Sequence, residues 1–274
     1  MRSFQNILAR VLNRLTVLDK VNLTVPLEFN GSQLKIPVIN RIGFDHLYIN
    51  KDYDFNVYNF FKDKMRAGVF MDVGANRGQT LLKILSIIPQ HPVVCIEPSA
   101  SCVNYLETLK SVNGFRSVTI VPAAIFDKNG IQKLYGAEVG DTGATLNPAG
   151  RQGQSFVLVN AIVGSELRAI QKEKFSFIKI DVEGEELAVL QTLRDVITSD
   201  QPVIYCEVLD AGGDADIPNN DQKKQRLRNF LTEINYKVCR LDERTNGLVD
   251  VDSFPSRAYR PENLDSCNYI FTKR

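Results

Sequence analysis

The sequence predicts an α/β protein with a doubly wound, mostly parallel sheet whose last strand is antiparallel. From residue 69 onward, short apolar runs alternate with segments of helical periodicity, which is typical of a parallel sheet covered by helices. The segment Val69–Gly78 reads as a buried strand, a glycine turn and the start of a helix. The final apolar run, Asn268–Thr272, follows Tyr236–Leu241 without an obvious helix between them. We therefore expect it to be an antiparallel strand at the edge of the sheet.

Length and composition suit one sizeable domain plus an extension. We assign residues 1–68 to an N-terminal amphipathic helix with a small β/α extension, and residues 69–274 to the main domain. Hydrophobic residues make up 44% of the 274, enough for a core, and 33 basic residues balance 32 acidic ones. Because a nucleic-acid-binding protein usually carries a basic excess, we expect no nucleic-acid partner.

The cysteines and the hydropathy bear on the compartment. The five cysteines show no metal-binding spacing, so we expect buried, reduced thiols. No apolar stretch approaches the length of a membrane span, and no secretory signal is visible. These observations favour the cytoplasm.

The first 68 residues divide into three predicted parts. Met1–Lys20 has seven apolar side chains at the spacing of one helical face, with basic residues elsewhere. This helix packs on the domain, docks on a partner or lies on a membrane surface; an organelle transit peptide is a third interpretation. Leu23–Phe29 and Gln33–Ile39 flank an Asn-Gly pair, a strong hairpin signal. Asp52–Met65 reads as a helix with aromatic residues facing inward.

Apolar periodicity and turn residues assign the remaining elements. The predicted helices are Thr80–Ile88, Ala100–Ser111, Glu185–Leu193 and Gln222–Ile234. The predicted strands besides those already named are Pro92–Ile96, Ser117–Val121, Ile131–Tyr135, Phe156–Val163, Phe175–Ile180 and Pro202–Val208.

The glycine turn after the first of these strands is a candidate ligand site. In a parallel sheet such a turn lies at the carboxyl end of the strand, where ligands bind. Gly74 and Gly78 bracket three residues, and glycine lets the backbone approach a ligand closely. A nicotinamide-binding turn needs further glycines where this chain has Asn76 and Gln79. An NAD-dependent oxidoreductase is therefore disfavoured.

Acidic residues recur at the predicted strand ends. They are Asp72, Glu97, Asp181 with Glu183, and Glu207. Glu97 lies 25 residues after Asp72, near the position at which dinucleotide folds place an acid on the ribose. Its two carboxylate oxygens can accept hydrogen bonds from both ribose hydroxyls.

Three segments together resemble the FkbM-type S-adenosylmethionine (SAM)-dependent methyltransferases. They are Phe-Met-Asp-Val-Gly-Ala-Asn-Arg-Gly-Gln at 70–79, Ile-Glu-Pro at 96–98 and Ile-Lys-Ile-Asp-Val-Glu-Gly-Glu-Glu at 178–186. The resemblance covers roughly residues 69–207 and implies a class I, Rossmann-like methyltransferase fold. It also implies methyl transfer to a hydroxyl group of a sugar, glycolipid or secondary metabolite.

The resemblance carries a set of cofactor-binding residues onto this chain. Those implied to hold the methionine part of SAM are Asp72, Gly74, Ala75, Asn76 and Gly78. Glu97 is implied to hold the ribose beside Pro98 and Ser99, while Ala123 and Ala124 flank the adenine. Asp181 and Glu183 are implied to face the sulfonium and the acceptor.

A hydroxyl acceptor must lose a proton, so we look for a base. Asp181 is the first candidate, Glu183 the second and His46 the third. Glu183 has an alternative interpretation as an acid at a helix N-terminus. Asp181, Glu183 and Glu207 would alternatively hold a divalent cation through oxygen ligands, although we assign no metal.

Two other functions compete with a SAM-dependent O-methyltransferase: a non-catalytic SAM- or nucleotide-binding module and the disfavoured oxidoreductase. The expected partners are a small-molecule or glycan acceptor and, through residues 1–20, a membrane surface or another protein. The sequence does not identify the acceptor or the oligomeric state.

Overall fold

The computed structural model describes residues 20, 22–48, 53–136, 143–146, 155–242, 244–245 and 247–274. The predicted helix Met1–Lys20 lies outside these residues except for Lys20. Among the helices that the structure describes, none combines the length and the apolar character needed to cross a membrane.

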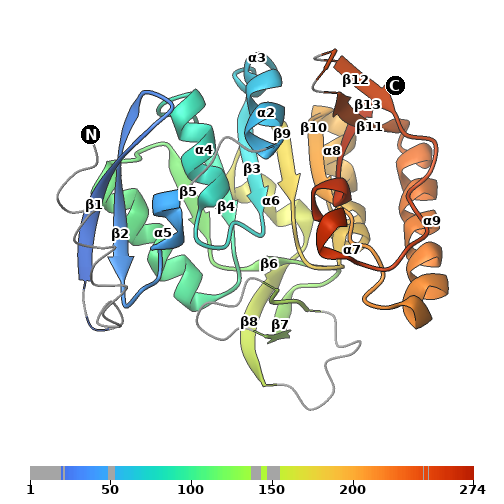
Figure 1. Cartoon of the computed structure of the whole chain (residues 1–274), viewed down its shortest axis with the longest axis horizontal. Helices are drawn as coiled ribbons and strands as arrows, with labels where there is room; N and C mark the ends of the chain where they lie inside the picture. The colour runs from blue at the N-terminus through green and yellow to red at the C-terminus, as the bar shows by residue number, and fades with distance from the viewer. Residues whose placement is uncertain are drawn as a thin grey trace.

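In the described part of the chain, the central sheet has eight strands (Figure 1). They are β3 (Val69–Val73), β4 (Val93–Ile96), β5 (Val118–Val121), β9 (Phe175–Ile180), β10 (Val203–Glu207), β11 (Tyr236–Asp242), β12 (Gly247–Asp250) and β13 (Asn268–Lys273). Their order is β12-β11-β13-β10-β9-β3-β4-β5. The doubly wound, mostly parallel sheet is confirmed.

The last strand is antiparallel as predicted, but its predicted edge position is wrong. β13 pairs antiparallel with β10 on one side and with β11 on the other. The edge is taken by β12, a strand that sequence reasoning missed, which pairs with β11. The hydrophobic pattern explains the difference, because β13 is buried on both faces at Tyr269, Ile270 and Phe271, as an interior strand requires.

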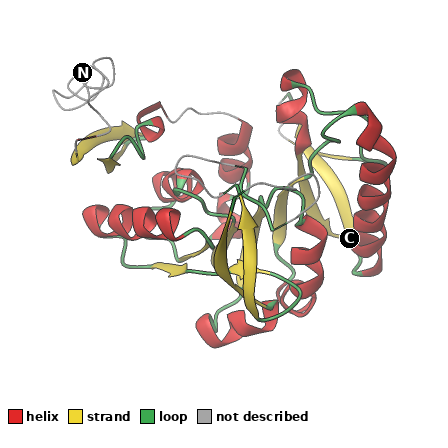
Figure 2. Ribbon diagram, turned by 90° about the horizontal axis from the view of Figure 1, so that it is seen from below, coloured by secondary structure: helices red, strands yellow, loops and turns green. Residues whose placement is uncertain are grey.

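Two hydrophobic cores cover the two faces of this sheet. One core joins the sheet to α2 (Tyr53–Phe60), α3 (Lys62–Met65), α4 (Gln79–Ile87) and α5 (Ala100–Asn113). The other joins it to α6 (Leu167–Ile170), α7 (Glu186–Thr192), α8 (Arg194–Asp200) and α9 (Ile217–Glu233). Figure 2 shows helices on both sides of the strands. Because strand side chains alternate between faces, Phe70 of β3 enters the first core and Met71 the second.

The N-terminal hairpin is confirmed and shares the first core. β1 (Asn22–Phe29) and β2 (Ser32–Ile39) pair antiparallel, and Asn30 and Gly31 at the turn both have positive φ. The Asn113 side chain donates to the Lys35 carbonyl and accepts from the Lys35 N–H, at 2.7 Å in each case. Residues on both sides of the predicted boundary at residue 68 therefore pack in one hydrophobic core.

A second, small sheet follows β5 in the chain. It has the order β6-β8-β7, with β6 (Ala124–Ile125), β7 (Gly130–Tyr135) and β8 (Phe156–Ile162). β7 and β8 were predicted as strands, and they form an antiparallel pair that projects below the central sheet in Figure 1. Leu134, Val159 and Ala161 are buried on one face of this pair.

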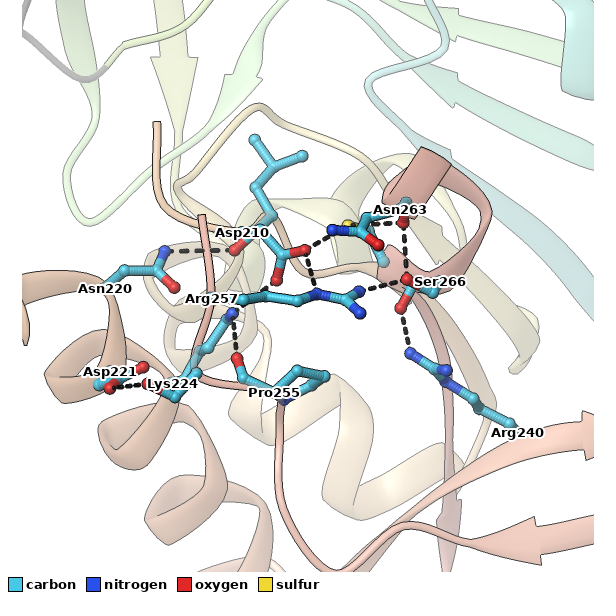
Figure 3. Close-up of polar contacts among 12 residues, drawn as sticks. Asp210, Asn220, Asp221, Lys224, Arg240, Pro255, Arg257, Asn263 and Ser266 are labelled. Carbon is cyan, nitrogen blue, oxygen red and sulfur yellow. Dashed lines mark hydrogen bonds and ion pairs between the residues drawn. The ribbon is translucent and has the colours of Figure 1, made fainter. Parts of the chain in front are cut away.

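The segment between β12 and β13 is fastened to the loop after β10 by a buried ionic cluster (Figure 3). The Asp210 carboxylate accepts from Lys224 Nζ at 2.9 Å and from Arg257 Nε at 2.7 Å. Lys224 also donates to the Pro255 carbonyl at 2.8 Å. Backbone bonds join the same two segments, including Val208 N–H to the Cys267 carbonyl at 2.7 Å.

Candidate functional site

The turn after β3 needs its two glycines for packing. Gly74 has φ 80°, and a Cβ placed there would lie 1.9 Å from the Asp181 carbonyl oxygen. Gly78 has φ 83°, immediately before α4, and its Cβ would lie 2.8 Å from a methyl of Leu106. Positive φ and close backbone approach are both conditions that favour glycine. The turn thereby brings the end of β3 against the end of β9.

A cavity opens at the carboxyl ends of β3, β4 and β9, with about 1000 Å³ of empty space when its open mouth is included. It contains most of the residues that were predicted to bind SAM or the acceptor: Gly74, Asn76, Glu97, Pro98, Ser99, Ala123, Ala124, Asp181 and Glu183. The small sheet supplies part of its wall through Ile125 and Leu134, and Thr145, from the segment between β7 and β8, also lines it. We call it the main cavity.

Glu97 joins the second strand end to the glycine turn. Its Oε2 accepts from the Asn76 N–H and its Oε1 from the Ser99 N–H, both at 2.8 Å. Burial raises the pKa of Glu97, and these two backbone hydrogen bonds oppose that rise. Each carboxylate oxygen has a second lone pair, so the group can still accept hydrogen bonds from a ligand in the main cavity.

Lys179 links three groups at the strand ends. It is paired with Asp72 across β3 and β9, and its Nζ lies 3.6 Å from Asp72 Oδ1, 3.3 Å from the Gly74 carbonyl and 2.9 Å from Asp181 Oδ2. Burial would lower the pKa of Lys179, but Asp181 and Asp72 raise it above its usual range. The ammonium therefore stays charged and fixes both carboxylates.

Asp72 lies beneath the site and not in its lining. Its side chain is fully buried and lines neither of the cavities described here. Burial raises the pKa of Asp72, and Lys179 lowers it. A contact between Asp72 and SAM stays a prediction. Lys179 contacts Asp72 and also lines the cavity described below, so it connects the buried carboxylate to the site.

Asp181 and Glu207 share a hydrogen bond, and their pKa values shift in opposite directions. Burial would raise the pKa of Asp181, but the neighbouring Lys179 lowers it. Burial and the Asp181 charge raise the pKa of Glu207 to about 9. At neutral pH Glu207 is therefore protonated, and its O–H donates a hydrogen bond to the ionised Asp181. The carboxyl group whose pKa is raised is thus Glu207, which was not among the candidate bases.

Glu183 stands between Asp181 and the start of α7, with φ 56°. Its backbone carbonyl accepts from Thr145 Oγ1 at 3.0 Å, which ties this turn to the segment beside the small sheet. Oxygens of Asp181, Glu183 and Glu207 lie within 4.8 Å of one another. Carboxylate oxygens are the hard ligands that divalent cations prefer. The alternative in which these three residues hold a divalent cation is therefore retained.

His46, the third candidate for the base, is not part of the lining of the site. It is fully buried and lines neither cavity. Its Nδ1 lies 2.9 Å from the Tyr105 hydroxyl, which itself donates to the Pro37 carbonyl at 2.8 Å, so Nδ1–H is the donor to Tyr105. Burial lowers the pKa of His46 to about 4. Tyr105 lies 59 residues away in the chain, and no local sequence signal pointed to this pairing.

A second cavity, of about 660 Å³, adjoins the main one. The two cavities share Gly74, Asn76, Arg77, Asp181 and Glu183. Ala75 lines only the second of them, and Gly78 lines neither. Sequence reasoning missed six residues of this second cavity: Asp54, Arg77, Gln79, Thr80, Lys83 and Lys179. Lys179 was predictable, because strand alternation places it on the same face as Asp181. Asp54 was not, because it lies 125 residues before Lys179 and belongs to no recognised motif.

The methyltransferase FkbM domain matches residues 72–238, more than half of the chain. A search of curated proteins finds no match. A solved FkbM methyltransferase from Methylobacillus flagellatus KT is 15% identical with a TM-score of 0.47, covering 76% of this chain and 44% of that one.

Two further solved structures resemble the chain. A precorrin-6y C5,15-methyltransferase from Geobacter metallireducens GS-15 is 13% identical, with a TM-score of 0.39 and coverage of 82% of this chain and 90% of that one. A SAM-dependent O-methyltransferase from Thermotoga maritima is 11% identical, with a TM-score of 0.42 and coverage of 92% and 77% respectively.

Proposed function

This chain belongs to the FkbM family of SAM-dependent methyltransferases, and from that premise we propose that it methylates a hydroxyl group of a sugar, glycolipid or secondary metabolite. The observation that carries the proposal is the meeting of two carboxylates, Asp181 and Glu183, with the cavity that contains Glu97 and the glycine turn. Glu97 and the glycine turn suit a nucleoside, and Asp181 and Glu183 suit an acceptor hydroxyl.

The residues of the main cavity fit SAM. Glu97 offers a buried carboxylate for ribose hydroxyls, and Pro98 and Ser99 stand beside it in the lining. Ala123 and Ala124 leave room for a flat base because their side chains are small. Gly74 and Asn76 expose turn backbone to the cavity. When bound, SAM supplies a methyl group activated by its sulfonium.

The acceptor hydroxyl would lie at the junction of the two cavities. Asp181 is ionised at neutral pH because Lys179 lowers its pKa, so it accepts the hydrogen bond of the hydroxyl and orients it. Glu183 lines the same junction and is the second group able to take the proton. Positioning of the reactants supplies much of the acceleration in such transfers.

The first prediction tests the cofactor assignment. Glu97→Ala should weaken SAM binding by ~1–3 kcal/mol, the scale for losing hydrogen bonds to a charged acceptor. Isothermal titration calorimetry measures the change, with Glu107→Ala as a matched control, because Glu107 is an exposed acid on α5. Equal SAM affinity in wild type and Glu97→Ala would remove Glu97 from the ribose site.

The activity itself is tested with methyl-labelled SAM and extracts that contain candidate acceptors. We expect label in a product whose methyl group is bonded to oxygen, identified by mass spectrometry and NMR. SAM binding without label transfer to any product would favour the non-catalytic binding module instead.

A further inference from the structure

The small sheet has two faces of different character. β7 and β8 pair so that Leu134, Val159 and Ala161 are buried on one face, and Leu134 lines the main cavity there. We call the opposite side of the β7–β8 pair the outer face. The register of the two strands and the alternation of side chains place six residues on it: Ile131, Lys133, Tyr135, Phe156, Leu158 and Asn160.

The large apolar side chains of the outer face are exposed to solvent. Leu158 is 66% exposed, Ile131 60% and Phe156 45%. Ile131 and Leu158 are diagonal neighbours across the two strands, and Phe156 is two residues from Leu158, so these side chains adjoin one another. Single exposed apolar residues are common on proteins, whereas adjoining ones mark a surface that interacts with something else.

The charge of the outer face is positive. Within the described strands β7 and β8, Lys133 is the only charged residue. Its Nζ lies 4.3 Å from the centroid of the Phe156 ring, and the Tyr135 ring contacts Phe156 edge-on at 5.9 Å between centroids. Lysine and tyrosine beside apolar side chains suit the boundary between lipid and water, because their polar ends reach the wet side. Anionic headgroups would complement the ammonium.

The size of the outer face argues against a protein as its occupant. A specific protein–protein interface uses roughly 20–30 residues on each side, and the outer face has six side chains. In a twofold dimer the face would meet itself and bring Lys133 toward its copy, with no acid in either strand pair to compensate. A lipid surface makes neither demand, since a few inserted apolar side chains beside a cation suffice for reversible binding.

We propose that the outer face of the small sheet docks on an anionic lipid surface, with Ile131, Phe156 and Leu158 inserted among the headgroups and Lys133 beside lipid phosphates. β7 and β8 project below the central sheet (Figure 1), where a flat surface can reach them. The face is small, so it acts together with a second contact, for which the predicted helix Met1–Lys20 is the candidate. The buried side of the same strands walls the main cavity, so docking holds that cavity near the membrane, whatever the acceptor is.

A fluorescent probe on the outer face tests the proposal in the full chain. The sequence contains no tryptophan, so a single introduced tryptophan reports on one position. Leu158→Trp is mixed with vesicles of phosphatidylcholine and phosphatidylglycerol. We expect its emission to shift to shorter wavelength and to be quenched by brominated phosphatidylcholine, because the indole enters the lipid. Ile131→Trp gives the same readout from the neighbouring strand if Leu158→Trp does not fold.

The matched control is Val249→Trp. Val249 is 50% exposed on β12, which lies away from the small sheet (Figure 1). Its emission should not change on the same vesicles, even where another part of the chain binds them. The comparison therefore separates insertion of the outer face from binding through residues 1–20.

Sedimentation with vesicles measures how much the face contributes. The double variant Ile131→Ser/Leu158→Ser should lower partitioning onto anionic vesicles about 10- to 100-fold, because two apolar side chains no longer leave water. Lys133→Gln should lower it about fivefold and leave partitioning onto pure phosphatidylcholine unchanged. Val249→Ser should partition as wild type does, and circular dichroism checks that each variant is folded.

Five results would overturn the inference. They are no binding of the wild type to anionic vesicles, equal binding to neutral ones, and unchanged emission of Leu158→Trp and Ile131→Trp on vesicles that bind the protein. The others are emission already at short wavelength in buffer and insensitive to lipid, which would mean that the chain covers its own face, and self-association that the double serine variant abolishes, which would make a second copy the occupant. Light scattering measures the last of these.

Discussion

At the scale of single residues, the site depends on one buried ammonium. Lys179 contacts two carboxylates, Asp72 and Asp181, that would otherwise be costly to ionise away from water. The proton on Glu207 then completes a chain in which Asp181 is held from two sides. This arrangement makes Asp181 a weak base but a well-fixed hydrogen-bond acceptor.

The residue-scale prediction concerns the chemical step. Asp181→Asn retains the shape and loses the charge, so turnover should fall ~10²–10⁴-fold, the usual contribution of a positioned acid–base group. SAM affinity should stay nearly constant, because the proposed partner of the ribose is Glu97 and not Asp181. Single-turnover kinetics with labelled SAM and calorimetry measure the two quantities.

Two comparisons make the Asp181 result specific. Glu207→Gln keeps a donor toward Asp181 and should lower turnover less than Asp181→Asn does. Treatment with chelator followed by magnesium or manganese tests the metal alternative, in which activity is lost and then restored. Normal turnover in Asp181→Asn would exclude Asp181 and leave Glu183 as the group to test.

At the scale of elements, the Asp210 cluster connects α9, the loop after β10 and the segment before β13. Asp210 and Lys224 have side chains only 3% and 5% exposed. Removing one partner of a buried ion pair leaves an uncompensated charge. Because the Val208–Cys267 bond follows Glu207 directly, the cluster also supports the end of β10, where Glu207 contacts Asp181.

Asp210→Ala should lower the free energy of unfolding by ~3–5 kcal/mol, the range for breaking a buried ion pair. Urea denaturation followed by circular dichroism measures it. Asp214→Ala is the matched control, because its pair with Arg260 is exposed at both ends and such pairs contribute ~0–1 kcal/mol. Equal losses in the two variants would show that the cluster does not anchor the segment.

At the scale of the whole molecule, the predicted helix Met1–Lys20 precedes a hairpin that shares the first core. We expect deletion of residues 1–19 to leave SAM affinity unchanged and to abolish docking on an anionic membrane or on a partner. Calorimetry and flotation with liposomes containing anionic lipid measure the two effects. A truncated protein that fails to fold would place the helix in the core and end the docking hypothesis.

The sequence predicted the parallel sheet well because its evidence is local: apolar runs, glycine turns and acids at strand ends. Asp181, Glu183 and Glu97 came from the same signals, since carboxyl ends of parallel strands share one edge. The place of β13 between β10 and β11, the pairing of His46 with Tyr105 and the presence of Asp54 in the site depend on contacts between distant segments. Such contacts leave no periodic trace in a single sequence.

The interior position of β13 has a consequence for how the protein is made. Among the described strands, β10 and β11 are connected in the sheet only through β13, whose residues are translated after those of all the others. While a nascent chain lacks residues 268–273, the outer edge of β10 has no partner, and an open strand edge invites pairing with other chains. A chain truncated shortly before this strand would therefore lack the strand that connects β10 to β11 and would expose the edge of β10. Such chains are substrates for chaperones and proteases.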